Sequence, residues 1–183
     1  MSLTVCLWLF VAMSRWRQAG CLSYVALGSN LGNSADFLRE AIRRLEQLSE
    51  VPLVRSSIWE TTPVDCPPGS PQFLNAVVEL APKPYETPES LLGKLQQLEN
   101  EFGRLPKKVL NEPRPLDLDL ITFGNEIRSS ARLILPHPRA HLRKFVLAPL
   151  AEIAPSLILP GQTQTVLELF NGLTSDETIR KWE

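Results

Sequence analysis

The sequence predicts an α+β domain in which an antiparallel sheet has helices packed on one face. Segments of strand and helix character follow one another in the order β-α-β-β-α-β between residues 23 and 124. The two helical segments have apolar residues spaced three and four apart, which is typical of helices with one buried face. Residues 116–120 alternate leucine with aspartate, which is typical of a strand with one buried face.

The first strand and helix of this order are short and clearly bounded. Residues 23–27 (SYVAL) form an apolar run with the length of a buried strand, and a turn rich in Gly, Asn and Ser follows it. The periodic segment at residues 36–50 predicts a helix with Asn33 or Ser34 as its N-cap. We expect Pro52 to end this helix.

Two further strands are predicted on either side of a proline-rich loop. Residues 53–61 are rich in β-branched and aromatic side chains, as strands are. The next stretch, TTPVDCPPGSP at residues 61–71, contains four prolines and is expected to be an irregular surface loop. Residues 73–80 (FLNAVVEL) then return to strand character.

The second helix and last strand complete the order. Thr87 as N-cap, Pro88 at the first helical position and Gly103 as the stop define a helix with a leucine stripe. A basic loop at residues 104–113 leads into the Leu/Asp strand. This order matches the ferredoxin-like βαββαβ arrangement. Prolines throughout the remaining segment predict only short strands and helices there.

Length and composition fit one globular domain. The chain has 183 residues, of which 44% are hydrophobic and 21% charged, as in average soluble proteins. A net charge of -1 gives no overall attraction to nucleic acid or anionic lipid. Residues 104–144, however, contain nine Lys or Arg against four acidic residues, while residues 23–103 contain six against eleven. Anion binding would therefore be local, the alternative being scattered solvated arginines.

Neither the cysteines nor the N-terminus predicts export. The three cysteines show no CxxC or Cys/His ligand spacing, which disfavours a disulfide framework and a zinc site and favours a cytoplasmic location. The apolar run at residues 3–13 is shorter than the roughly 20 residues that span a bilayer. It has no preceding Lys or Arg, unlike a secretory signal, which stays the alternative. We expect an extension at residues 1–22, a domain at 23–172 and a tail at 173–183.

Asp117 and Asp119 are the most specific chemical feature of the sequence. Two residues apart on a strand, they project from the same face. Paired carboxylates at this spacing suit divalent cations, and hard oxygen ligands favour magnesium. Arg114 and the basic residues of the preceding loop add the guanidinium groups of a polyphosphate clamp. The alternative for the two aspartates is an exposed polar strand face.

Four segments together resemble the 6-hydroxymethyl-7,8-dihydropterin pyrophosphokinase family of folate synthesis. They are YVALGSNLG, FLNAVVEL, PRPLDLDLI and LPHPRAHLRKFVLAPLAEIAP, and the similarity keeps their order from about residue 23 to 172. The resemblance implies transfer of pyrophosphate from ATP to the pterin hydroxymethyl oxygen, with attack on the β-phosphorus and release of AMP. It also implies two magnesium ions on Asp117 and Asp119.

The resemblance assigns further roles residue by residue. Arg104 and Arg114 match arginines that bind phosphates and stabilise the transferring charge, and so join the two aspartates as catalytic residues. Positions matching ATP contacts are Gln96, Glu99, Lys107, Arg114, Arg132, His137 and Arg143. Positions matching the pterin pocket are Thr61, Thr62, Val64, Phe73, Asn75 and Phe145, with the two phenylalanines on either side of the flat ring.

Three departures from the family pattern leave a second interpretation open. Pro106 stands where many relatives have another arginine, Asn111 where some have an aromatic residue on a mobile loop, and Pro138 where an aromatic residue often follows the histidine. The protein could therefore be a weakened paralogue that binds pterin or nucleotide without efficient turnover. From a different class, a ferredoxin-like ligand-binding module stays open too. We expect a monomer whose partners are ATP and the pterin, with neither nucleic acid nor membrane.

Overall fold

The computed structural model describes residues 22–104 and 111–182 of the chain. Its main sheet has the strand order β5-β1-β4-β3-β8, and every strand pair in it is antiparallel. The strands are β1 (Ser23–Ser29), β3 (Trp59–Thr61), β4 (Phe73–Leu80), β5 (Asp117–Phe123) and β8 (Ile179–Lys181). A short strand, β2 (Val54–Arg55), pairs with β4 beside β3. The fold is thus a mixed α and β structure with an antiparallel sheet.

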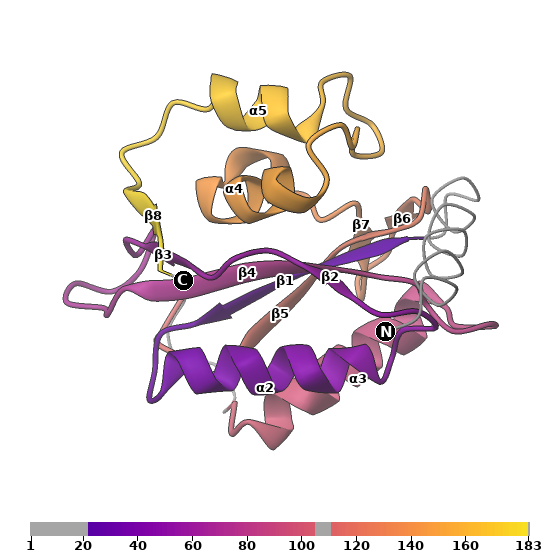
Figure 1. Ribbon diagram of the computed structural model, residues 1–183, viewed down its shortest axis with the longest axis horizontal. Coiled ribbons are helices and arrows are strands. Elements are labelled where there is room, and N and C mark those ends of the chain that lie inside the picture. The colour runs from indigo at the N-terminus through magenta and orange to yellow at the C-terminus, as the bar shows by residue number, and fades with distance from the viewer. Residues whose placement is uncertain (1–21, 105–110, 183) are drawn as a thin grey trace, which may run out of the picture.

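Helices cover both faces of the sheet, whereas the sequence predicts helices on one face only (Figure 1). The two long helices α2 (Ser34–Glu46) and α3 (Pro88–Glu101) lie on one face, and α4 (Lys144–Ile153) and α5 (Val166–Gly172) lie on the other. Each side has its own hydrophobic core: Leu27, Leu38 and Leu95 belong to the first, and Ala26 and Leu147 to the second. Because both of its faces are covered, β1 is buried along its whole length.

The alternation along β5 decides on which side its aspartates lie. Leu118 and Leu120 are buried in the core under α2 and α3. Asp117 and Asp119 are partly exposed and therefore point to the face that carries α4. The predicted Leu/Asp strand is confirmed, as are the predicted strand Phe73–Leu80 and the helix capped by Thr87, whose hydroxyl accepts the Ser90 N–H at 3.1 Å.

Three predicted boundaries are wrong. The first strand continues to Ser29, two residues past its predicted end. The first helix ends at Glu46, before residue 50, because Ser49 pairs with the end of β4: its hydroxyl accepts the Ala81 N–H at 3.1 Å. The strand predicted at residues 53–61 is interrupted at Ser56. There the Ser56 hydroxyl, in place of a backbone carbonyl, accepts the Val77 N–H at 3.0 Å.

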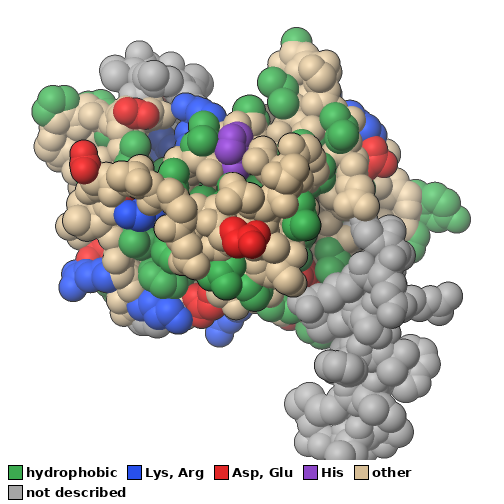
Figure 2. Space-filling model, turned by 90° about the horizontal axis from the view of Figure 1, so that it is seen from above, with side chains coloured by type: hydrophobic (Ala, Val, Ile, Leu, Met, Phe, Trp, Pro, Cys, Tyr) green, Lys and Arg blue, Asp and Glu red, His purple; other side chains and the backbone are tan. Residues whose placement is uncertain are grey.

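The segment after β5 contains only short helices and strands, as its prolines predict. It contains the hairpin β6 (Arg128–Ser129) and β7 (Ile134–Leu135), a 3-10 turn (Ala140–Leu142), α4 and α5, before β8 joins the sheet beside β3. Within residues 22–104 and 111–182, no helix has the length and apolar character that crossing a membrane requires. On the face that carries α4 and α5, charged side chains are scattered among apolar and uncharged ones (Figure 2).

Candidate active site

A cavity of about 680 Å³, open to solvent on one side, lies on the α4 face of the sheet. Its floor comes from β1, β4 and β5, and its walls come from β3, the proline-rich loop, the start of α4 and the loop before β5. Ten residues of the predicted site line this cavity: Thr61, Thr62, Val64, Phe73, Asn75, Arg114, Asp117, Asp119, Arg143 and Phe145. The structure therefore brings most of the predicted residues into one place.

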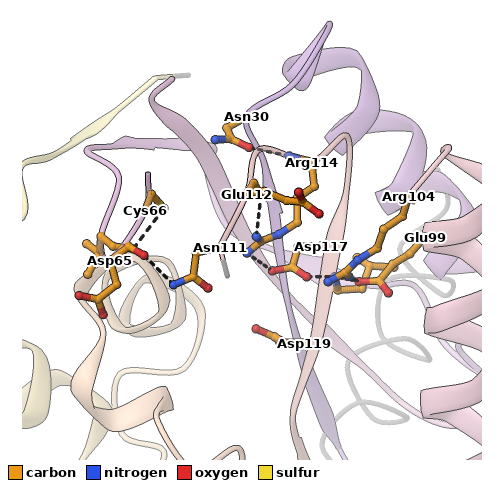
Figure 3. Close-up of polar contacts among 12 residues, drawn as sticks. Asn30, Asp65, Cys66, Glu99, Arg104, Asn111, Glu112, Arg114, Asp117 and Asp119 are labelled. Atoms are coloured by element: carbon orange, nitrogen blue, oxygen red, sulfur yellow. Dashed lines mark hydrogen bonds and ion pairs between the residues drawn. The ribbon is translucent and has the colours of Figure 1, made fainter. Parts of the chain in front are cut away.

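Asp117 and Asp119 share the cavity floor. In the β1–β5 pairing, Asp117 lies opposite Gly28 and Asp119 opposite Ala26. Both carboxylates face the cavity, as the spacing predicts, and Figure 3 shows them one after the other along the same strand. The leucines between and after them anchor this register in the core below.

Two arginines hold the Asp117 carboxylate, one on each oxygen (Figure 3). Arg104 Nη1 lies 2.7 Å from Oδ1, and Arg114 Nη2 lies 2.7 Å from Oδ2. Arg104 follows α3 directly, whereas Arg114 comes from the loop before β5. The Arg114 backbone is fixed in turn, because its N–H donates to Asn30 Oδ1 at 2.9 Å. Charge-assisted contacts of this kind orient both guanidinium groups toward the cavity floor.

Glu99 supports this cluster from α3. Its Oε1 accepts the Leu118 N–H at 2.7 Å and contacts Arg104 Nη1. Burial raises the pKa of Glu99 to about 7, and the charges of Asp117 and Asp119 raise it further, although the Leu118 N–H and Arg104 oppose the change. Glu99 therefore ties the end of α3 to β5 and positions Arg104.

Asp119 lies near a histidine and an arginine, both at longer distances. Its Oδ2 is 3.9 Å from His137 Nε2 and 3.9 Å from Arg143 Nη1. Burial raises the pKa of Asp119, and the charge of Asp117 adds to this, while His137 and the arginines oppose it. Burial also lowers the pKa of His137. The backbone places His137 here, because its N–H donates to the Ile121 carbonyl at 2.8 Å.

Two aromatic side chains line the cavity, and each carries a guanidinium over its ring. Arg114 Cζ lies 5.6 Å from the Phe73 ring centre, and Arg143 Cζ lies 5.2 Å from that of Phe145. Phe73 begins β4 and Phe145 lies in the first turn of α4, so the rings come from different layers of the fold. This geometry connects the apolar part of the cavity to its cationic part.

Asn75 and Thr61 form the polar edge of the apolar part. Asn75 is buried and donates from Nδ2 to Thr61 Oγ1 at 2.8 Å. The Asn75 Oδ1 lies next to Gly28, where a Cβ atom would be only 3.1 Å from it. This side of the cavity thus has hydrogen-bonding groups and no bulky side chain.

Several lining residues were not among the predicted site residues. Gly28, Asp65, Cys66 and Asn111 line the same cavity. Asn111 has a φ of 54° and donates from Nδ2 to the Asp65 carbonyl at 2.9 Å, which links the loop before β5 to the proline-rich loop (Figure 3). A glycine inside a strand signals a close approach, but the sequence predicts a turn from Gly28 onward and therefore hides this signal. The loop residues carry no such signal.

Four predicted ATP contacts in the described residues do not line the cavity: Gln96, Glu99, Arg132 and His137. Glu99 and His137 are nevertheless held beside β5 by the contacts given above. Gln96 and Arg132 are exposed on α3 and after β6, outside the set of lining residues. Lys107, like Pro106, lies outside the described residues. Roles for Gln96 and Arg132 in binding nucleotide therefore stay predictions.

The donor set on the cavity floor fits magnesium. Two carboxylate groups, which are hard oxygen ligands, share one face of the strand. Burial and the charge of Asp117 raise the pKa of Asp119, and a divalent cation would offset both effects. Among the described residues, no group of three or more His, Cys, Asp or Glu is arranged to hold a metal ion. Magnesium is commonly held by one or two protein carboxylates together with water and substrate phosphates, which agrees with a pair.

Comparison with known sequences gives a consistent result. Residues 24–155 match the model of the family described as 7,8-dihydro-6-hydroxymethylpterin-pyrophosphokinase (HPPK). The chain is 39% identical over 159 residues to the 2-amino-4-hydroxy-6-hydroxymethyldihydropteridine pyrophosphokinase of Haemophilus influenzae, covering 86% of this chain and 96% of that one. It is 41% identical over 163 residues to the Bacillus subtilis protein of the same name, covering 88% and 90%.

Longer relatives match over part of their length. The chain is 39% identical over 129 residues to a folate synthesis bifunctional protein of Arabidopsis thaliana, covering 70% of this chain and 26% of that one. Among solved structures, wild-type HPPK-DHPS of Plasmodium falciparum matches with a TM-score of 0.62 at 13% identity, covering 82% of this chain and 44% of that one. At this identity the structural likeness supports the fold alone.

Proposed function

The chain belongs to the 7,8-dihydro-6-hydroxymethylpterin-pyrophosphokinase family, and from this premise we propose how its cavity performs the reaction. The enzyme transfers pyrophosphate from ATP to the hydroxymethyl group of 6-hydroxymethyl-7,8-dihydropterin, releasing AMP, in folate synthesis. The observation that carries the proposal is that one cavity joins an aromatic slot to a carboxylate and arginine cluster.

The pterin ring occupies the slot between Phe73 and Phe145. Flat heterocycles stack favourably on aromatic faces, and the missing side chain at Gly28 leaves room at the slot edge. Asn75, held by Thr61, presents its amide to the ring edge, where an amide can donate and accept. Thr62 and Val64 close the slot from the proline-rich loop.

The triphosphate of ATP lies over the cavity floor. Asp117 and Asp119 would hold two magnesium ions there, which neutralise phosphate charge and lower the pKa of the attacking hydroxyl. Arg104 and Arg114 neutralise Asp117 in the described structure. When substrate binds, we expect these guanidinium groups to turn from the carboxylate to phosphate oxygens, for which their paired donors are equally suited.

His137 and Arg143 complete the phosphate site from the α4 side. Both already lie 3.9 Å from Asp119, so they face the same part of the floor. Arg143 also lies over Phe145, so one side chain contacts both the ring wall and the charged cluster. We expect this contact to align the pterin hydroxyl with the phosphate chain, which lowers the entropic cost of the reaction.

The finer classification belongs to the same proposal. We assign the core to the ferredoxin-like class because β5, β1, β4 and β3 lie in that order and α2 and α3 cover one face. We also propose that one copy of the chain is sufficient for activity, since it supplies both the aromatic slot and the carboxylate and arginine cluster. A dependence of specific activity on protein concentration would contradict this.

One assay tests the reaction. Protein, ATP, magnesium and hydroxymethyldihydropterin are incubated, and the nucleotide product is identified by chromatography. We expect AMP to form only when both magnesium and the pterin are present. ADP would indicate an ordinary kinase. Tight ATP binding with very slow AMP release would favour the weakened paralogue.

A further inference from the structure

The last residues of the chain join the two walls of the cavity. Residues 174–182, called here the C-terminal strap, lie beside β3 at one end and beside the start of α4 at the other. β3 leads into Thr61 and Thr62, and the start of α4 carries Phe145. The strap itself contributes no residue to the cavity.

On the β3 side, the contacts are backbone hydrogen bonds. Thr61 pairs with Ile179 in the antiparallel register. The Thr62 N–H donates to the Thr178 carbonyl at 3.2 Å, and the Thr178 N–H donates to Thr62 Oγ1 at 3.1 Å. The strap thus fixes the backbone at the point where β3 enters the proline-rich loop.

On the α4 side, the contacts centre on Glu177. Its side chain is buried and its carboxylate faces the backbone N–H groups of Lys144 and Phe145 in the first turn of α4. Glu177 Oε1 is buried without a hydrogen-bond partner among the described residues, so the carboxylate acts on this end of α4 through the negative charge of its oxygens. The strap is held there by Lys144 Nζ, which donates to the Ser175 carbonyl at 3.2 Å, and by the Glu177 N–H, which donates to Ser175 Oγ at 3.1 Å.

α4 has no negative charge of its own at its N-terminus. Its N-cap residue, Arg143, makes no side-chain cap, and its first turn has no acidic residue. The first N–H groups of a helix need acceptors, and negative charge stabilises that end. Burial raises the pKa of Glu177 to about 7 against the opposing effects of Lys144 and these N–H groups. Burying a carboxyl group costs free energy, so we interpret the buried Glu177 as serving this end of α4.

We propose that Glu177 is a positioning residue that sets the distance between the Phe145 wall and the Thr61 wall of the pterin slot. The proposal rests on the pterin site assigned above. It predicts a larger effect on pterin binding than on nucleotide binding. Arg104, Arg114 and the two aspartates lie on β5 and its preceding loop, and among the described residues Arg143 is the one member of the proposed phosphate site that faces Glu177.

Steady-state kinetics of the full chain test it, with each substrate varied at saturating levels of the other. For Glu177→Ala we expect the pterin KM to rise about fivefold, the effect of a lost cap, while the ATP KM stays within about twofold of wild type. Glu177→Gln keeps an acceptor and should restore the wild-type pterin KM. Asp176→Ala, at the exposed neighbouring position, is the matched control.

Three outcomes would overturn the proposal: an unchanged pterin KM in Glu177→Ala, equal increases in both KM values, or no rescue by Gln. If Glu177→Ala does not fold, Glu177→Asp is measured instead. Its side chain is one methylene shorter, and the same three outcomes would overturn the proposal. Calorimetric titration with the pterin gives the comparison without turnover. A wild-type protein that binds pterin but forms no AMP would contradict the proposed function and leave this comparison intact.

Discussion

A Cβ atom at Gly28 would lie 3.1 Å from Asn75 Oδ1 and 3.9 Å from both the Phe73 ring and the Asp117 side chain. Gly28 is therefore the point at which the polar edge, the aromatic wall and the charged floor of the cavity meet. Asn75 lies opposite it in the β1–β4 register, so the close approach is built into the strand pairing.

Gly28→Ala should impair pterin binding more than nucleotide binding. The added methyl group displaces the Asn75 amide and narrows the slot, and we expect the pterin KM to rise about tenfold, equivalent to about 1.4 kcal/mol. The ATP KM should stay near wild type. Gly93→Ala, where the added atom meets nothing within 4 Å, is the control. Equal pterin KM values in the two variants would contradict a slot at Gly28.

Asp119→Ala should abolish magnesium-dependent AMP formation without unfolding the protein. Changes to groups that only support metal ligands already cost about 10- to 100-fold, so we expect a loss in kcat of at least about 100-fold. Stability should not fall, because the change removes a carboxyl whose pKa is raised by burial and by the charge of Asp117. Glu46→Ala, at an exposed position on α2, is the control. A wild-type rate in Asp119→Ala would end the metal assignment.

Arg104→Lys should lower kcat although the positive charge is kept. A lysine cannot contact Asp117 and Glu99 as the guanidinium does, nor offer phosphate a planar pair of donors. We expect a loss of roughly 100-fold, comparable with removal of one preorganised donor to a developing charge. The exposed Arg55→Lys is the matched control. Full activity in Arg104→Lys would show that a point charge is sufficient at this position.

The stability of the protein should depend on Glu177 between about pH 4.5 and pH 7. The folded-state pKa of this carboxyl is raised from 4.5 to about 7, so folding binds a proton in this range. Its contribution to the free energy of unfolding is fully present below pH 4.5 and is lost as the pH rises through 7. The shift corresponds to on the order of 3 kcal/mol.

Urea denaturation of wild type and Glu177→Gln at pH 5 and pH 8 measures this effect. The variant lacks the titrating proton, so its stability relative to wild type should increase from pH 5 to pH 8. Lys144 and Arg143 face the same carboxyl and are present in both proteins, so they do not produce the difference. A difference in unfolding free energy that is the same at both pH values would contradict the raised pKa.

The elements that the sequence predicts well are those whose pattern reflects burial. β4 is found with its predicted bounds, and the Thr87 cap and Gly103, with a φ of 83°, bound α3 as expected. The predicted strand at residues 53–61 fails at Ser56 because a side-chain hydrogen bond replaces a backbone one, and residue propensities do not register such a substitution.

The candidate site was predictable where its residues share an element. Asp117 and Asp119 face one cavity because strand geometry requires it. Phe73 and Phe145 come from separate layers, and only the family resemblance indicated that they act together. No sequence pattern indicates a role for Glu177. The groups that it faces are the backbone N–H groups of Lys144 and Phe145, which lie more than thirty positions away and leave no trace in the choice of side chains.

β8 also decides what the outer edge of the sheet offers to other molecules. Without it, the backbone donors and acceptors of Trp59–Thr61 would form an open edge, on which a strand of another chain could pair. With it, the outermost strand is three residues long and carries Arg180 and Lys181. Short, charged edge strands disfavour such pairing, so β8 also lowers the tendency of the protein to aggregate through this edge.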